Sequence, residues 1–173
     1  MAYLPVTILG VYMFSHITVG TNNLSRSAAF YDALLLPLGM RRRHEKPDGG
    51  PDAACYGLPG QMLPIFYVHE TFNRLPATAG NGSMVAFLAS SAALVDVAYT
   101  AGLNAGGTDE GAPGERPHYG KGYYGAYLRD PDGNKVHIVF RGDFCWSARR
   151  SDACLKITMR RTGAAARHFG LHV

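Results

Sequence analysis

The sequence carries the same order of predicted elements twice. Residues 14–20 (FSHITVG) alternate between apolar and polar positions, which predicts a strand, and residues 24–39 place apolar side chains at helical spacing. Residues 83–89 (SMVAFLA) and 92–103 (AALVDVAYTAGL) repeat this plan. At a constant offset of 68 positions, the matched pairs are His16 with Met84, Tyr31 with Tyr99, and Gly39 with Gly107. Such self-similarity predicts two copies of one supersecondary unit.

Each predicted helix begins at a polar residue of the type that caps helices. Asn22 or Asn23 precedes the first helix, and Ser90 or Ser91 precedes the second. A side-chain oxygen at this position accepts a hydrogen bond from a backbone N–H of the first helical turn. The first helix should end near Pro37, since proline cannot continue a helix interior.

Together these elements predict an α+β fold of two modules, each a strand, a helix and about three further strands. The modules span residues of about 13–70 and 82–141, and the Pro- and Gly-containing residues 71–81 link them. Helices on one face of a curled, mixed or antiparallel sheet bury one apolar layer. We therefore assign residues 1–142 to a single domain and residues 143–173 to a basic C-terminal extension.

The net positive charge of the chain lies entirely in that extension. The formal net charge of +4 comes from residues 143–173, which hold six Lys or Arg and two Asp or Glu, while residues 1–142 are balanced. A nucleic-acid partner is therefore not expected for the domain, and no apolar run approaches the ~20 residues of a membrane helix. Three cysteines without CxxC spacing favour the reducing cytoplasm. Glycine-rich phosphate loops are missing from the sequence, so no nucleotide cofactor is expected.

The second module closes on a hairpin, residues 122–140 (GYYGAYLRDPDGNKVHIVF). Pro131 and the Asp132-Gly133 pair supply turn chemistry between two apolar strands. A single histidine, His137, interrupts the second strand. This segment, two strands joined by a DPDGN turn with one polar residue in the second strand, resembles the closing hairpin of the vicinal-oxygen-chelate superfamily. That superfamily includes glyoxalases, bleomycin resistance proteins and extradiol dioxygenases.

This resemblance covers about 130 residues and implies two βαβββ modules whose sheets form a cleft, in a protein that is often a homodimer. The segment 111–119 (GAPGERPHY) before the hairpin is similar to that of an uncharacterised bacterial subgroup of glyoxalase-like proteins. A small-molecule ligand in the cleft is what the resemblance implies.

In that superfamily a metal is held by the first and last strands of each module. Transferred through the repeat, these positions are His16, Pro64, Met84 and His137. Only the two histidines suit a divalent ion such as Zn, Fe, Mn or Ni, because proline has no side-chain donor and thioethers prefer Cu(I). A catalytic centre normally has three protein ligands. The candidates for the third are His69, Glu70 and His118. The two histidines need not come from the same subunit, and each could instead be hydrogen-bonded in a metal-free pocket.

Further candidates surround these positions in sequence. Arg116 could clamp an anionic substrate, and His118 or Glu70 could act as a general base. Tyr127 could donate a phenolic proton during catalysis. Tyr67, Phe87 and Tyr123 would give the cleft aromatic walls and so bind substrate. The alternative is that the aromatic residues pack the core and that Arg116 and His118 only pin their loop.

Two functions remain open from the sequence. One is a metal-assisted lyase, isomerase or dioxygenase acting on a small oxygenated substrate, with His16 and His137 as ligands. The other is metal-free sequestration of a small molecule, such as a drug or antibiotic, as in bleomycin resistance proteins. The histidines at two of the four ligand positions, His16 and His137, favour the enzyme. The residues at the other two positions, Pro64 and Met84, do not suit a divalent ion and favour sequestration. Pro64 and His137 stand where glyoxalase I would have glutamates, which disfavours that particular activity.

Overall fold

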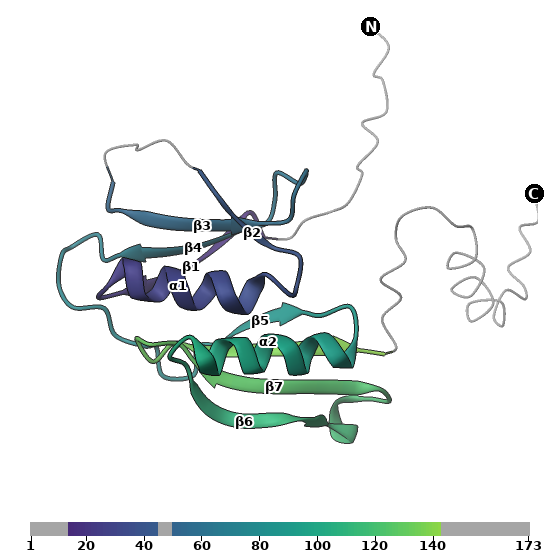
Figure 1. Cartoon of the computed structure of the whole chain (residues 1–173). Coiled ribbons are helices and arrows are strands. Elements are labelled where there is room, and N and C mark those ends of the chain that lie inside the picture. Colours follow the sequence, from purple (N-terminus) through teal and green to yellow (C-terminus); the bar gives the residue numbers. More distant parts are fainter. Residues whose placement is uncertain (1–13, 45–49, 143–173) are drawn as a thin grey trace, which may run out of the picture.

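A computed structural model describes residues 14–44 and 50–142 of the chain (Figure 1). The predicted C-terminal extension lies outside the described residues, as does most of the segment before the first strand. No helix within these described ranges is long and apolar enough to cross a membrane.

The first module is a four-stranded mixed sheet with one helix. Its sheet order is β1-β4-β3-β2, with β1 parallel to β4 and the other pairs antiparallel. The elements are β1 (His16–Thr21), α1 (Leu24–Leu35), β2 (Arg41–Arg43), β3 (Ala53–Gly57) and β4 (Ile65–Glu70). As predicted, the helix ends before Pro37.

The second module has the same topology, which confirms the repeat. Its sheet order is β5-β8-β7-β6, again with the first and last strands of the module parallel. The elements are β5 (Val85–Leu88), α2 (Ala92–Asn104), β6 (Thr108–Glu115), a 3₁₀ turn (Pro117–Tyr119), β7 (Tyr123–Arg129) and β8 (Lys135–Arg141). The α+β class is therefore confirmed, as two separate four-stranded sheets.

Both helices begin at caps that the sequence offered. The side chain of Asn23 accepts a hydrogen bond from the backbone N–H of Arg26, at 2.9 Å. The hydroxyl of Ser91 accepts one from the N–H of Leu94, at 3.3 Å. Of the two candidates at each helix start, the second one is therefore the cap.

One core joins the two modules. Figure 1 shows α1 and α2 side by side on the same side of the two sheets, and the helices are in contact. Phe66 of β4 meets Phe87 of β5 edge to face, with ring centroids 5.1 Å apart, and it also contacts Tyr31 of α1 at 4.9 Å. Gly102 of α2 leaves room for Leu34, since a Cβ at Gly102 would lie 3.0 Å from that leucine. Within residues 14–44 and 50–142, no helix covers the opposite faces of the sheets.

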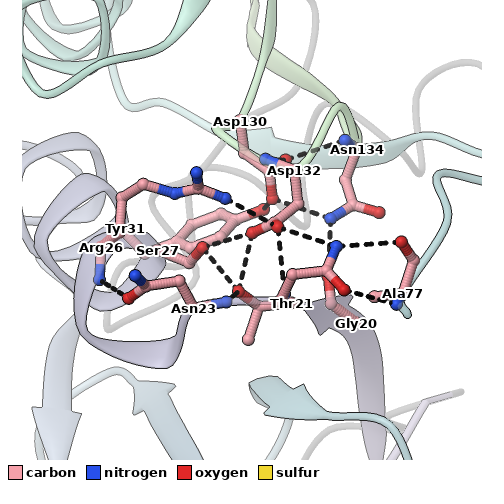
Figure 2. A network of polar contacts seen from close by, with 11 residues as sticks. Gly20, Thr21, Asn23, Arg26, Ser27, Tyr31, Ala77, Asp130, Asp132 and Asn134 are labelled. Atoms are coloured by element: carbon pink, nitrogen blue, oxygen red, sulfur yellow. Dashed lines mark hydrogen bonds and ion pairs between the residues drawn. The ribbon is translucent and has the colours of Figure 1, made fainter. Parts of the chain in front are cut away.

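The loop between β7 and β8 fastens the second module to the start of α1. Figure 2 shows the carboxylate of Asp132 among donors from the first module. Thr21 donates to it at 2.7 Å, Ser27 at 2.6 Å and Arg26 at 2.8 Å, and the backbone N–H of Asn22 donates at 3.0 Å. The Asp132 side chain is only 2% exposed.

A second carboxylate of the loop completes this contact. Asp130 accepts a hydrogen bond from the hydroxyl of Tyr31 at 2.8 Å and binds the amide of Asn134, which in turn donates to the carbonyl of Gly20 (Figure 2). We call this network the inter-module clasp: Thr21, Asn22, Arg26, Ser27, Tyr31, Asp130, Asp132 and Asn134. The sequence indicated a turn here and gave no sign of the contacts across the modules.

Candidate functional site

His137 lies on the face of the second sheet that the helices leave uncovered. Along β8 the side chains of Val136 and Ile138 join the core, so the alternation of a strand turns His137 to the other side. Tyr127 is its register partner on β7. The imidazole stacks on the Tyr127 ring with centroids 4.3 Å apart, and the ring of Tyr123 lies 6.0 Å away on the same face.

Two residues of the 3₁₀ turn extend this array of rings. Tyr119 lies 5.1 Å from the Tyr123 ring, and His118 contacts Tyr119 at 4.1 Å. We define the aromatic face as Tyr119, Tyr123, Tyr127 and His137. His118 and Tyr119 are themselves exposed. The structure therefore brings together five of the predicted candidates, namely Arg116, His118, Tyr123, Tyr127 and His137.

Gly125 of β7, which has no side chain, leaves the space that the imidazole of His137 occupies. A Cβ built at Gly125 would lie 2.6 Å from Nε2 of His137, a distance that real contacts do not reach. The histidine is 2% exposed, and its Nε2 is the only buried side-chain nitrogen or oxygen without a hydrogen-bond partner among the described residues. Nε2 is thus directed at the backbone of β7.

The surroundings hold this histidine in its neutral form. Burial, followed by the positive charges of Arg116 and Lys135, lowers the pKa of His137 to about 4. Loss of solvation and nearby cations both disfavour an imidazolium. At neutral pH the imidazole of His137 is therefore an uncharged part of the aromatic face and a weak base.

Three cations lie over the rings of the aromatic face. Arg116 stands 5.9 Å and Lys135 5.2 Å from the centre of the Tyr127 ring, and Arg141 stands 5.6 Å from that of Tyr123. The guanidinium of Arg116 also donates to the carbonyls of Ala112 and Glu115, so it is pinned to its own loop. Sequence reasoning missed Lys135 and Arg141. Their even spacing from His137 along a strand would have placed them on the same face.

The first sheet holds the other candidates at separate places. His16 and Tyr67 meet edge to face on its uncovered side, with centroids 5.7 Å apart. Glu70 pairs with Thr21 at the far end of β1, five residues from His16, or roughly 16 Å along the strand. It lines a separate polar pocket of about 790 Å³, together with Asp52 and Arg74. Glu70 and His16 are therefore not brought together within the chain.

An apolar pocket of about 530 Å³ lies between the two modules. We call it the seam pocket; it is lined mainly by side chains of β1, β4 and β5 and of the loops beside them, including Ile17, Pro64, Phe66, Ala86, Phe87 and Leu88. Phe87 thus lines a cavity and packs in the core at once. The pocket borders the aromatic face, because Ala86 is the register partner of His137, and His137 that of Tyr127.

These residues do not fit a three-ligand metal centre within one chain. No group of three His, Cys, Asp or Glu side chains comes together in the part of the chain that the structure describes. His16 lies on the first sheet and His137 on the second, and Nε2 of His137 is turned to Gly125. The histidine pair stays a prediction that a second subunit would have to complete.

Comparison with known proteins places this geometry in a family. The model of the Glyoxalase/Bleomycin resistance protein/Dioxygenase superfamily matches residues 13–138. A crystal structure of a glyoxalase/bleomycin resistance protein from Albidiferax ferrireducens T118 is similar at 41% identity over 75% of this chain and 99% of that one, with a TM-score of 0.65.

More distant structures share the fold. A glyoxalase-related enzyme from Fulvimarina pelagi is 21% identical over 82% of this chain and 96% of that one, with a TM-score of 0.61. Lactoylglutathione lyase from Agrobacterium tumefaciens is 19% identical over 76% of this chain and 94% of that one, with a TM-score of 0.51. No curated protein matches the chain. From its family match and its paired βαβββ modules, the chain belongs to the glyoxalase/bleomycin resistance protein/dioxygenase superfamily.

Proposed function

We propose that this protein binds a small molecule in the seam pocket, with part of the ligand lying on the aromatic face, and that binding requires no metal. The single observation that carries the proposal is the apolar cavity of about 530 Å³ beside His137. Its volume falls within the range of roughly 300–1,000 Å³ that small-molecule sites occupy. Phe66 and Phe87 offer ring surfaces inside it, which favours a ligand with a flat apolar part.

Filling the pocket should abolish this binding. Ala86 is exposed and lines the cavity, so Ala86→Phe would place a ring in the space that the ligand needs. Titration with N-phenyl-1-naphthylamine, a neutral dye that fluoresces in apolar sites, is expected to saturate with the wild type. For Ala86→Phe we expect the affinity for the dye to fall at least about tenfold, because the new ring occupies the binding space. A tenfold loss corresponds to ~1.4 kcal/mol of binding free energy.

Ala53→Phe is the matched control, because Ala53 is an exposed alanine on β3 that does not line the pocket. It should bind the dye as the wild type does. If Ala86→Phe also binds like the wild type, the seam pocket is not the binding site.

A metal-assisted lyase, isomerase or dioxygenase is the second candidate. The buried and unpartnered Nε2 of His137 favours it, because such an atom is costly unless it gains a partner. We further propose that the protein is a homodimer, in which His16 of one subunit and His137 of the other could share a ligand. A cytoplasmic location suits a sequence whose three cysteines have no CxxC spacing.

Metal analysis separates the two candidates. Protein purified without a histidine tag and offered Fe(II), Mn(II), Ni(II) or Zn(II) is expected to retain less than one equivalent. His16→Ala and His137→Ala should then show the same content as the wild type. One equivalent in the wild type, lost in both variants, would replace binding with the metalloenzyme as the proposed function.

A further inference from the structure

We propose that the part of the ligand inside the seam pocket is flat and uncharged and carries an N–H donor beside a carbonyl acceptor, as an aromatic lactam does. This pair of groups would bind the backbone C=O of Ala86 and the backbone N–H of Leu88, on the edge of β5. The inference rests on the proposed function and adds the chemical class of the ligand.

The first argument is that an unpaired strand edge lines the pocket. β5 is the outermost strand of its sheet, and among the described strands only β8 pairs with it. We call the side of β5 that faces away from β8 the free edge. Phe87 packs into the core, whereas Ala86 lies on the uncovered side with His137, and both line the pocket. Only the edge of a strand borders both of its faces, so the free edge of β5 faces the seam pocket.

The pairing of β5 with β8 determines which backbone groups point to the free edge. The backbone N–H of Ala89 donates to the carbonyl of Val139 at 2.7 Å, so Ala89 and, two positions earlier, Phe87 direct their backbone groups at β8. Along a paired strand, successive residues alternate in the side to which their N–H and C=O point. The backbone groups of Ala86 and Leu88 therefore point to the free edge.

The spacing of these groups suits one donor beside one acceptor. In a parallel ladder, a single residue bonds the C=O of one residue and the N–H of the residue two positions further along. Val139 has this place opposite Leu88, between Phe87 and Ala89. On the free edge, the C=O of Ala86 and the N–H of Leu88 have the same spacing. A lactam offers its N–H and C=O side by side, as the amide groups of a strand residue are offered.

The second argument is the loss of water when the pocket fills. Ala86 is exposed, so water can solvate its backbone groups while the pocket is empty. A ligand in the pocket covers the free edge and displaces that water. A covered N–H or C=O without a partner is costly, because its hydrogen bond to water is not replaced. Ligands that supply both partners should therefore be preferred over apolar molecules of the same shape.

The lining of the pocket argues for an uncharged ligand. None of the described residues that line it is Asp, Glu, Lys, Arg or His, and Gln61 and Ser90 are its polar side chains. A charged group in such a site would lose hydration without gaining a counter-charge. A neutral amide keeps strong hydrogen bonds without that cost.

Two compounds of the same shape test the proposal. Isocarbostyril is a lactam of two fused rings, and isocoumarin has a ring oxygen in place of its N–H. Displacement of N-phenyl-1-naphthylamine measures the affinity of each for the wild type. We expect isocarbostyril to bind at least about tenfold more tightly, because the ring oxygen of isocoumarin would face the carbonyl of Ala86 and leave it unpaired.

A proline at position 88 tests the other half of the contact. Leu88→Pro removes an N–H that points to the free edge and takes no part in the pairing with β8, and an edge strand tolerates such a proline. The affinity for isocarbostyril, relative to that for the dye, should fall about tenfold, since the dye has no carbonyl. Leu88→Val is the matched variant: it also shortens the side chain but keeps the N–H, and should keep the wild-type ratio. Circular dichroism checks that both variants fold.

Each outcome decides the proposal. Equal affinities of the wild type for isocarbostyril and isocoumarin would overturn the lactam, whether or not Leu88→Pro folds. An equal fall of the ratio in Leu88→Pro and Leu88→Val would also overturn it, because the side chain and not the N–H would then matter. In both cases dye binding that is lost in Ala86→Phe keeps the seam pocket as the site. Failure of the wild type to bind the dye would overturn the proposed function itself.

Discussion

Replacing Asp132 by alanine is expected to lower the free energy of unfolding by about 3 kcal/mol, the scale of breaking a buried, charge-assisted contact. Its carboxylate accepts from Thr21, Ser27, Arg26 and the backbone of Asn22, and its removal would leave these donors without their acceptor. The two modules would lose the hydrogen bonds of Asp132 that join the β7–β8 loop to the start of α1. Urea unfolding followed by circular dichroism measures the change.

Asp96→Ala is the matched control for this variant. Asp96 is an exposed carboxylate on α2 that accepts one side-chain hydrogen bond, from Tyr124 at 2.8 Å. Its loss should cost less than about 1 kcal/mol. A similar effect of both substitutions would show that the inter-module clasp contributes no more than a surface contact.

The contribution of Asp132 should also depend on pH. Although burial alone raises its pKa, hydrogen bonds from Ser27, Thr21 and Asn22, together with the charge of Arg26, hold the pKa of Asp132 below its ordinary value. Its stabilising effect is therefore complete above the unfolded-state pKa of about 3.9 and is lost as pH falls through the lower folded-state pKa. The stability difference between the wild type and Asp132→Asn should shrink over that acidic range.

The repeat was sufficient to predict the α+β class and the two modules, because both halves follow the same local rules. The pairing of βαβββ modules was implied by the resemblance to the superfamily. Strand alternation, caps and helix breakers act over a few residues, so they can be recognised in sequence. The clasp could not be predicted in this way. Asp132 meets partners 105 to 111 positions away, and no local pattern encodes which donors a turn carboxylate will find.

The candidate site was predictable only in part, for a similar reason. Tyr123, Tyr127 and His137 come together because one antiparallel hairpin carries them all on the same face. The resemblance makes His16 a metal-ligand position, and sequence context alone makes Glu70 a candidate for the third ligand. The parallel register of β1 with β4 separates these two residues. The seam pocket depends on how β1, β4 and β5 pack, which is a property of the tertiary structure.

Gly125→Ala is expected to destabilise the protein by about 1–3 kcal/mol, the usual cost of overpacking a filled site. The added methyl group would lie 2.6 Å from Nε2 of His137 and 3.2 Å from the carbonyl oxygen of Ile138. The backbone of β7 cannot retreat without breaking its pairing with β8, so the imidazole has to move. Its stacking on Tyr127 would be lost with it.

Histidine titration followed by NMR reports this movement directly. In the wild type the pKa of His137 is about 4, mainly because of burial. An imidazole displaced towards solvent regains hydration, so its pKa should rise towards the ordinary value of about 6.5 in Gly125→Ala. The signals of His16 and His69, on the first sheet, should be the same in both proteins. An unchanged His137 titration would mean that the imidazole keeps its buried position without the space that Gly125 provides, and that another contact holds it neutral on the aromatic face.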